Sequence, residues 1–219
     1  MIKKRDTQIV FQSMYCAIGI IGIIASTGFF EYDFNPNFAI YFTNLSNYFC
    51  IGVMFVALVQ TLKKKEDSYV TINPLVKFTG VMSILLTGLV YNIMLAPTYD
   101  PIENFQPNSV ILHIVLPIMF VADWFLFYER KKLKWFYPLL TTVSPLGYIA
   151  FIYIRGAILE YDTQNHLIYP YFFLNLDTEG ITGAIKWIIL LTVAFVIVAY
   201  LLFGVDRITG GKKRNKQDI

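Results

Sequence analysis

Residues 181–204 read ITGAIKWIILLTVAFVIVAYLLFG, and Lys186 is the only charged residue among them. A helix needs about 20 mostly apolar residues to cross the hydrocarbon core of a bilayer, so this stretch predicts a membrane-spanning helix. Similar apolar blocks precede it near residues 8–30, 38–62, 75–96, 109–128 and 135–155. The sequence therefore predicts an all-α integral membrane protein. We expect one membrane domain over residues 1–219, a bundle of six transmembrane helices that ends in a tail at 205–219.

The charges of the chain predict how this bundle is oriented. The protein has 219 residues, of which 56% are hydrophobic and 15% charged. Its basic residues gather in four segments, at 3–5, 63–65, 130–134 and 207–216. Of 18 Lys and Arg residues, Arg155 and Lys186 alone lie at the margins of the alternate, acidic connections. Basic loops face the cytoplasm, so both termini are expected there. The net charge of +3 thus reflects topology, and we expect no nucleic-acid partner.

Several kinds of site are disfavoured by composition. The chain has two histidines and two cysteines, none of them at metal-ligand spacing, and no phosphate-binding glycine loop follows a strand. We therefore predict no metal and no cofactor. Cys16 and Cys50 both fall in apolar blocks, so a disulfide is not expected. Residues 1–27 could be read as a cleavable signal peptide, but the apolar run is long for one, and we expect it to be retained as the first helix.

Polar side chains within the spans are the first candidates for function, because they cost free energy in hydrocarbon. At a rise of 1.5 Å per residue, Thr43, Asn92 and His113 each lie roughly 6 to 7 Å below the outer ends of their predicted helices. Arg155 marks the outer end of the fifth helix. The sequence thus predicts one polar layer in the outer leaflet.

His113 is the one histidine of the chain within a predicted span. A neutral imidazole can take a proton from a hydroxyl, as general-base catalysis requires. Pro117 cannot donate a hydrogen bond to the carbonyl of His113, so we expect a free carbonyl and a kink beside the histidine. The alternative is a histidine that hydrogen-bonds between helices and takes part in no chemistry.

Three other polar residues have both a functional and a structural interpretation. Asn47 and Asn92 are candidate oxyanion donors, although Asn47 also belongs to a stripe of small and polar residues typical of helix packing. Arg155 could bind a substrate carboxylate near the lipid headgroups. It could equally be an interfacial anchor, since long basic side chains reach the interface from helix ends.

Asp123 is a carboxylate near the inner end of the fourth span. Ionisable side chains within a membrane are usually paired. Because Asp123 lies far from the layer of Thr43 and His113, we expect a structural role for it. Its partner should be a neighbouring helix or a cation of an inner loop.

The outer connection at 156–180 is rich in aromatic residues, including the run Tyr169-Pro170-Tyr171-Phe172-Phe173. Such a run is too apolar to extend freely into water. It either lies in the interface as part of an aromatic belt or folds over the helix ends as a lid.

Three short motifs resemble one family of membrane proteins. They are Phe42-Thr43-Asn44-Leu45, Leu112-His113-Ile114-Val115-Leu116-Pro117 and Tyr169-Pro170-Tyr171-Phe172. In order and spacing they resemble the androgen-induced-gene family, which includes the androgen-dependent TFPI-regulating protein and bacterial members. With Asp123-Trp124 and Arg155-Gly156, the chain looks more like the bacterial branch.

This resemblance implies a function. Family members are six-helix threonine hydrolases that cleave fatty acid esters of hydroxy fatty acids, and Thr43 and His113 stand at the positions of the threonine nucleophile and the histidine. We therefore expect an intramembrane lipid ester hydrolase in a bacterial cytoplasmic membrane. Its lipid substrate would come from the bilayer, and its site would face the outer leaflet. A small transporter and a non-catalytic scaffold are the alternatives.

Overall fold

The computed structural model describes residues 2, 4–30, 32–68, 72–100, 102, 105–159 and 167–209. His166 and residues 210–219 of the predicted tail lie outside this part of the chain. Residues 205–209, which were also assigned to the tail, continue the last helix instead. The described residues are helical and loop segments without a strand.

Six helical segments are long and apolar enough to cross a membrane, which confirms the predicted all-α membrane fold. The elements that form them are α1 (Arg5–Ser26), α2 (Phe42–Lys63), α3 (Pro74–Val90), α5 (Pro107–Val110), α6 (Leu116–Phe127), α7 (Tyr137–Leu140), α8 (Val143–Leu159) and α9 (Leu176–Thr209). Several spans are interrupted. Gly180, with φ 63° and ψ 171°, breaks the first turn of α9 from its long remainder. A turn at Thr141 and Thr142 separates α7 from α8, close to the prolines Pro138 and Pro145.

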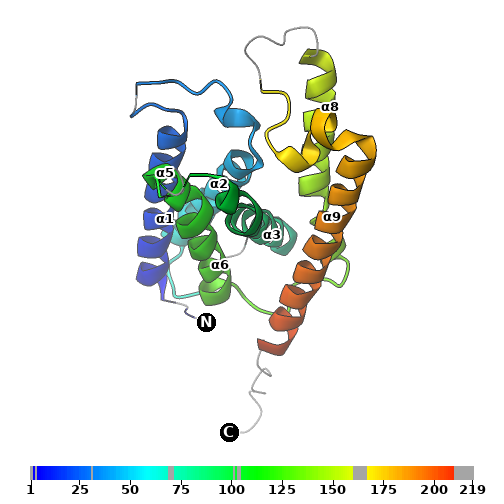
Figure 1. Cartoon of the computed structure of the whole chain (residues 1–219). Helices are drawn as coiled ribbons and strands as arrows, with labels where there is room; N and C mark the ends of the chain where they lie inside the picture. The colour runs from blue at the N-terminus through cyan, green and yellow to red at the C-terminus, as the bar shows by residue number, and fades with distance from the viewer. Residues whose placement is uncertain are drawn as a thin grey trace, which may run out of the picture.

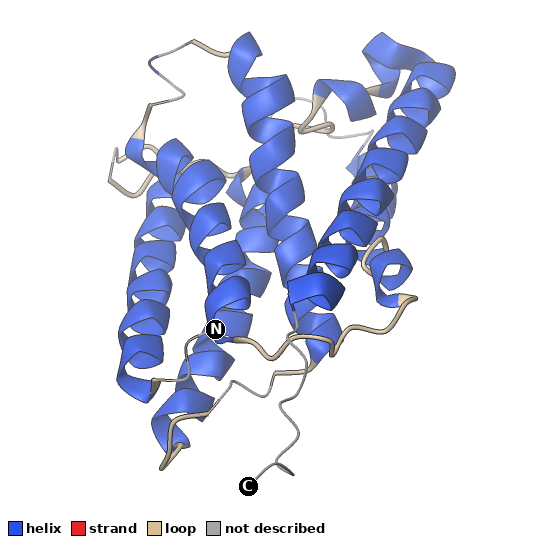
Figure 2. Ribbon diagram, turned by 90° about the horizontal axis from the view of Figure 1, so that it is seen from below, coloured by secondary structure: helices blue, strands red, loops and turns tan. Residues whose placement is uncertain are grey.

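The bundle has two parts. Helices α1, α2, α3 and α6 form a closely packed group, and α8 and α9 stand beside it (Figure 1). Viewed from below, the spanning helices again run roughly alongside one another, with the N-terminus near one end of the bundle (Figure 2).

The predicted basic segments meet at one end of the bundle. The Arg5 side chain donates to the carbonyl of Leu62 over 3.0 Å, which places the start of α1 beside the end of α2. Arg130 lies 3.7 Å from Asp206, so the connection after α6 meets the end of α9. We call this the inner end and the opposite one, where α2 begins, the outer end, after the orientation that the charges predict.

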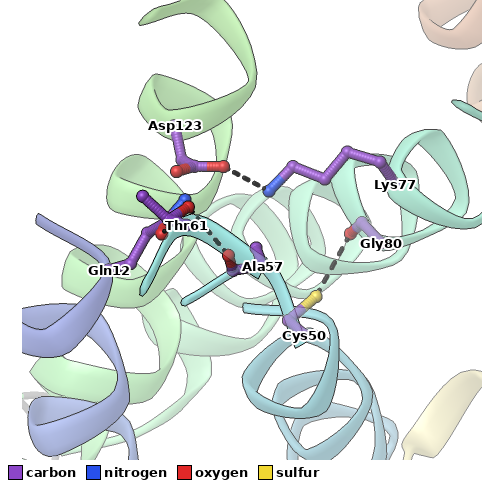
Figure 3. A network of polar contacts seen from close by, with 7 residues as sticks. All are labelled: Gln12, Cys50, Ala57, Thr61, Lys77, Gly80 and Asp123. Carbon is purple, nitrogen blue, oxygen red and sulfur yellow. Dashed lines mark hydrogen bonds and ion pairs between the residues drawn. The ribbon is translucent and has the colours of Figure 1, made fainter. Parts of the chain in front are cut away.

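A buried ion pair joins α3 to α6 in the inner half of the bundle (Figure 3). Lys77 Nζ lies 2.7 Å from Asp123 Oδ2, and both side chains are fully buried. The ammonium also lies 3.5 Å from the centroid of the Phe120 ring, a cation–π contact. The expected structural partner of Asp123 is thus confirmed as a lysine of a neighbouring helix.

Candidate functional site

Thr43 lies in the first turn of α2 at the outer end of the bundle. The hydropathy pattern predicts a helix from residue 38, but residues 38–40 form a 3-10 turn, and Tyr41 is extended, with φ −74° and ψ 134°. The α-helix therefore begins at Phe42. Backbone N–H groups in the first turn of a helix have no acceptor within it, so those of Phe42 and Thr43 are available to other partners.

His113 lies on a π-helical segment, η4 (Ile111–Val115), which ends two residues before Pro117. A second π-helical segment, η2 (Tyr91–Leu95), continues α3 opposite it. The rings of His113 and Tyr91 are stacked, with centroids 3.5 Å apart and planes at 7°. Tyr91 Oη in turn lies 2.6 Å from Ser109 Oγ. The imidazole is thus held between a tyrosine ring and the backbone of its own helix.

The hydroxyl of Thr43 and the imidazole of His113 form a hydrogen-bonded pair. Thr43 Oγ1 lies 3.2 Å from His113 Nε2, and His113 Nδ1 lies 2.9 Å from the carbonyl oxygen of Ser109. A carbonyl can only accept, so Nδ1 carries the hydrogen in neutral histidine, and Nε2 presents its lone pair to Thr43. This is the tautomer that a general base for the threonine hydroxyl requires.

Tyr171 completes the surroundings of Thr43. Its hydroxyl lies close to the side chain of Thr43 and to the backbone of Phe42 and Thr43, whose polar groups favour the ionised phenol. Burial raises the pKa of Tyr171 to about 12, so the phenol stays protonated at neutral pH and can donate. Its ring stacks on Phe173 at 5.2 Å. The sequence predicts this loop to be either an aromatic belt or a lid, and it does not predict that Tyr171 reaches Thr43. The motif Tyr169-Pro170-Tyr171-Phe172 was the sequence signal that could have identified this residue.

Two cavities meet at Thr43. The first, here called the apolar cavity, has a volume of about 70 Å³ and lies between α3, α8 and α9. The second, here called the vestibule, has about 330 Å³ at the outer end. The vestibule is lined by Ser26, Asn35, Tyr41, Thr43, Asn44, Tyr91, Leu95, Tyr99, Asn108, Ser109, Leu112, His113 and Tyr171. Thr43 and Tyr171 line both spaces, whereas His113 lines the vestibule and not the apolar cavity.

A cleft between α2, α3 and α8 adjoins the apolar cavity. It is lined by Phe42, Leu45, Ser46, Phe49, Ser83, Ser144, Gly147, Tyr148 and Phe151. Phe42 and Tyr148 line both the cleft and the apolar cavity, and their rings are in contact at 5.1 Å. These two rings therefore separate the cleft from the space beside Thr43.

The other predicted site residues use their side chains elsewhere. Asn47 is fully buried and donates to the carbonyls of Thr43 and Leu112, at 2.8 and 3.3 Å. Asn92 donates to the carbonyl of His113 over 3.2 Å, so it partners the oxygen that Pro117 leaves free. Arg155 donates to the carbonyl of Leu167 over 2.8 Å. None of the three lines the vestibule or the apolar cavity.

Neither a metal-binding cluster among the described residues nor a match to a known protein indicates the function of this site. Within the described ranges, no group of three or more His, Cys, Asp or Glu residues could hold a metal ion. Compared with known proteins, the chain matches no family profile, no curated protein and no solved structure. The function must therefore be argued from the site itself.

Proposed function

We propose that this chain is a membrane ester hydrolase in which Thr43 is the nucleophile and His113 the general base. The observation that supports this most is the 3.2 Å contact between Thr43 Oγ1 and His113 Nε2, with Nδ1 bonded to the Ser109 carbonyl. The contact lies within the reach that proton transfer needs. The resemblance of the surrounding motifs to the androgen-induced-gene family supports the same assignment.

The reaction would proceed through an acyl-threonine. Thr43 Oγ attacks the ester carbonyl while its proton passes to His113 Nε2. The tetrahedral intermediate then collapses, and His113 returns the proton to the leaving alcohol. Water from the vestibule, deprotonated by His113, hydrolyses the acyl-threonine and releases the fatty acid. One ester and one water give one acid and one alcohol.

The start of α2 would stabilise the oxyanion. The N–H groups of Phe42 and Thr43 belong to the first turn of α2, at the positive end of the helix dipole, a favourable place for negative charge. The hydroxyl of Tyr171, which lines both spaces beside Thr43, would supply a third donor. Preorganised donors of this kind typically contribute the largest share of rate enhancement in acyl transfer.

The first carbons of the acyl chain would bind in the apolar cavity, whose volume of about 70 Å³ equals that of about two waters, and the rest of the chain would extend toward the bilayer. A hydrocarbon chain is compatible with the apolar lining on that side of Thr43. The cleft between α2 and α8 would give the chain a lateral route from the bilayer to the cavity, past Phe42 and Tyr148. By the positive-inside rule, the basic segments at the other end of the bundle support a vestibule that faces the outer leaflet, as proposed for a bacterial cytoplasmic membrane protein.

Hydrolysis by purified variants tests the proposal. Thr43→Ala and His113→Ala should each lower kcat/KM for a lipophilic medium-chain ester at least about 100-fold. The first variant lacks the nucleophile and the second lacks the general base of the acyl-threonine mechanism. Thr27→Ala is a matched control, since the Thr27 hydroxyl is also at the outer end but only donates to the carbonyl of Ile24. A folded Thr43→Ala protein with wild-type activity would exclude the proposal.

A further inference from the structure

A groove runs between α3 and α6, in addition to the spaces beside Thr43. It has a volume of about 500 Å³, and among its described lining residues Asn92 and His113 alone have polar side chains. Leu89 and Ile118 line it and are 43% and 64% exposed, so the groove opens on the surface of the bundle. Among described residues it shares His113 with the vestibule and none with the apolar cavity.

This groove extends over about the depth of one leaflet. Its two walls belong to the segments Pro74–Thr98 and Pro107–Phe127, both long and apolar enough to span a membrane. From His113 to Phe125 the helix rises by roughly 18 Å, at 1.5 Å per residue, and half of the hydrocarbon core measures about 15 Å. A surface groove at this depth contacts lipid chains. Its apolar lining therefore fits an alkyl chain that lies along α6.

Asn92 gives the outer end of the groove a hydrogen-bond acceptor. Its amide nitrogen donates to the carbonyls of Gly88 and His113, at 2.7 and 3.2 Å. Its amide oxygen accepts from none of the residues that the structure describes, and the side chain is exposed. A polar group without a partner in hydrocarbon costs free energy. A ligand that brings a donor to this end of the groove would remove that cost.

The contacts on offer favour a head that donates and carries no charge. A hydroxyl can donate to the Asn92 oxygen, whereas an ionised carboxylate can only accept. No described lining residue is a Lys or Arg that could pair with an acidic head, and none is an Asp or Glu that could pair with an ammonium. A charge held in an apolar groove without a partner is costly. A neutral hydroxyl head therefore fits this end of the groove.

We propose that the groove between α3 and α6 binds a lipid with one alkyl chain and a neutral hydroxyl head, such as a long-chain alcohol or a monoalkylglycerol. The hydroxyl donates to the amide oxygen of Asn92, and the chain runs along α6 toward Phe125. This site is separate from the space in which Thr43 and His113 meet. It rests on the contacts of the groove and not on the proposed hydrolysis.

Photolabelling of the full-length protein in phosphatidylcholine nanodiscs tests this proposal. The probe is 1-O-hexadecylglycerol with a diazirine in its chain, an ether that an esterase cannot cleave. Hexadecanoic acid with the same diazirine, kept ionised, is the matched probe with a head that only accepts. We expect adducts of the ether on residues 85–92 and 113–125, found by mass spectrometry of peptides. They should exceed those of the acid by roughly fivefold, the factor expected for one hydrogen bond.

Three variants locate the bound lipid. Ala122→Trp fills the groove and should lower labelling by the ether severalfold. Ala194→Trp is its matched control, because Ala194 is exposed on α9 and does not line the groove, and labelling should be unchanged. Asn92→Leu removes the acceptor and should bring labelling by the two probes to the same level.

Equal labelling of the wild type by the two probes would overturn the proposal. So would wild-type adducts that excess unlabelled ether does not reduce, or labelling that Ala122→Trp and Ala194→Trp change alike. The outcome is distinct from that of the proposed function. A protein that hydrolyses no ester but is labelled in the groove keeps the lipid site and loses the hydrolase, and the reverse pattern keeps the hydrolase alone.

Discussion

Replacing Lys77 by methionine should destabilise the fold strongly, because it would leave a carboxylate alone in the bundle. Lys77 Nζ and Asp123 Oδ2 are 2.7 Å apart, and both side chains are fully buried. Asp123 Oδ1 has no hydrogen-bond partner among the described residues, so nothing else compensates the charge. Removing one member of a buried pair costs about 3 to 5 kcal/mol. That corresponds to a change of about 10² to 10⁴-fold in the unfolding equilibrium.

The double variant Lys77→Met with Asp123→Leu should recover most of the lost free energy of unfolding. Apolar residues of similar size often replace a buried ion pair at little or no cost. The comparison separates the loss of one charge from the loss of the pair. Lys186→Met serves as a control, because Lys186 is exposed and should not affect stability.

Unfolding by SDS in mixed micelles, followed by tryptophan emission, gives the free energies. Trp124 is a suitable reporter, since it is nearly fully buried and its ring lies 5.8 Å from that of Phe78 on α3. We expect the Lys77→Met protein to unfold at clearly lower SDS and the double variant to unfold near the wild type. A Lys77→Met protein as stable as wild type, or a double variant less stable than the Lys77→Met protein, would refute the reasoning.

Three further predictions concern the site. Tyr171→Phe should lower kcat about 10²-fold with little change in KM, the usual cost of one oxyanion donor; an unchanged kcat in steady-state assays would remove Tyr171 from the mechanism. Asn92→Ala leaves the carbonyl of His113 without its side-chain donor and should cost about 1 kcal/mol in SDS unfolding, whereas a gain in stability would argue against that contact. Gly147→Phe, at a position with open space around its Cβ, should block the cleft and slow long-chain esters more than short ones, while Gly204→Phe, also at an open position, should not; equal effects of the two would exclude this route.

The membrane fold could be predicted because hydropathy and charge act over whole segments. Long apolar blocks define spans whatever their packing, and the six-helix bundle follows from them. The layer that brings Thr43 near His113 followed from depth alone, since each residue of a helix rises by a fixed distance. Pro117 likewise indicated a free carbonyl at His113, because proline cannot donate to it.

The finer parts of the site depend on features that hydropathy does not record. The break at Tyr41 falls in an apolar run, so the sequence placed the start of α2 near residue 38 and missed the N–H groups of Phe42 and Thr43. Which way Asn47 and Asn92 face depends on the rotation of each helix about its axis. Tyr171 reaches Thr43 from a loop, where no periodicity predicts direction.

The most direct test of the central claim is to identify the residue that becomes acylated. The protein would be treated with an oleoyl fluorophosphonate and its peptides examined by mass spectrometry. We predict one adduct, on Thr43, whose formation is lost in His113→Ala and retained in Thr27→Ala. An adduct on another residue, or labelling of Thr43 that persists without His113, would contradict the account.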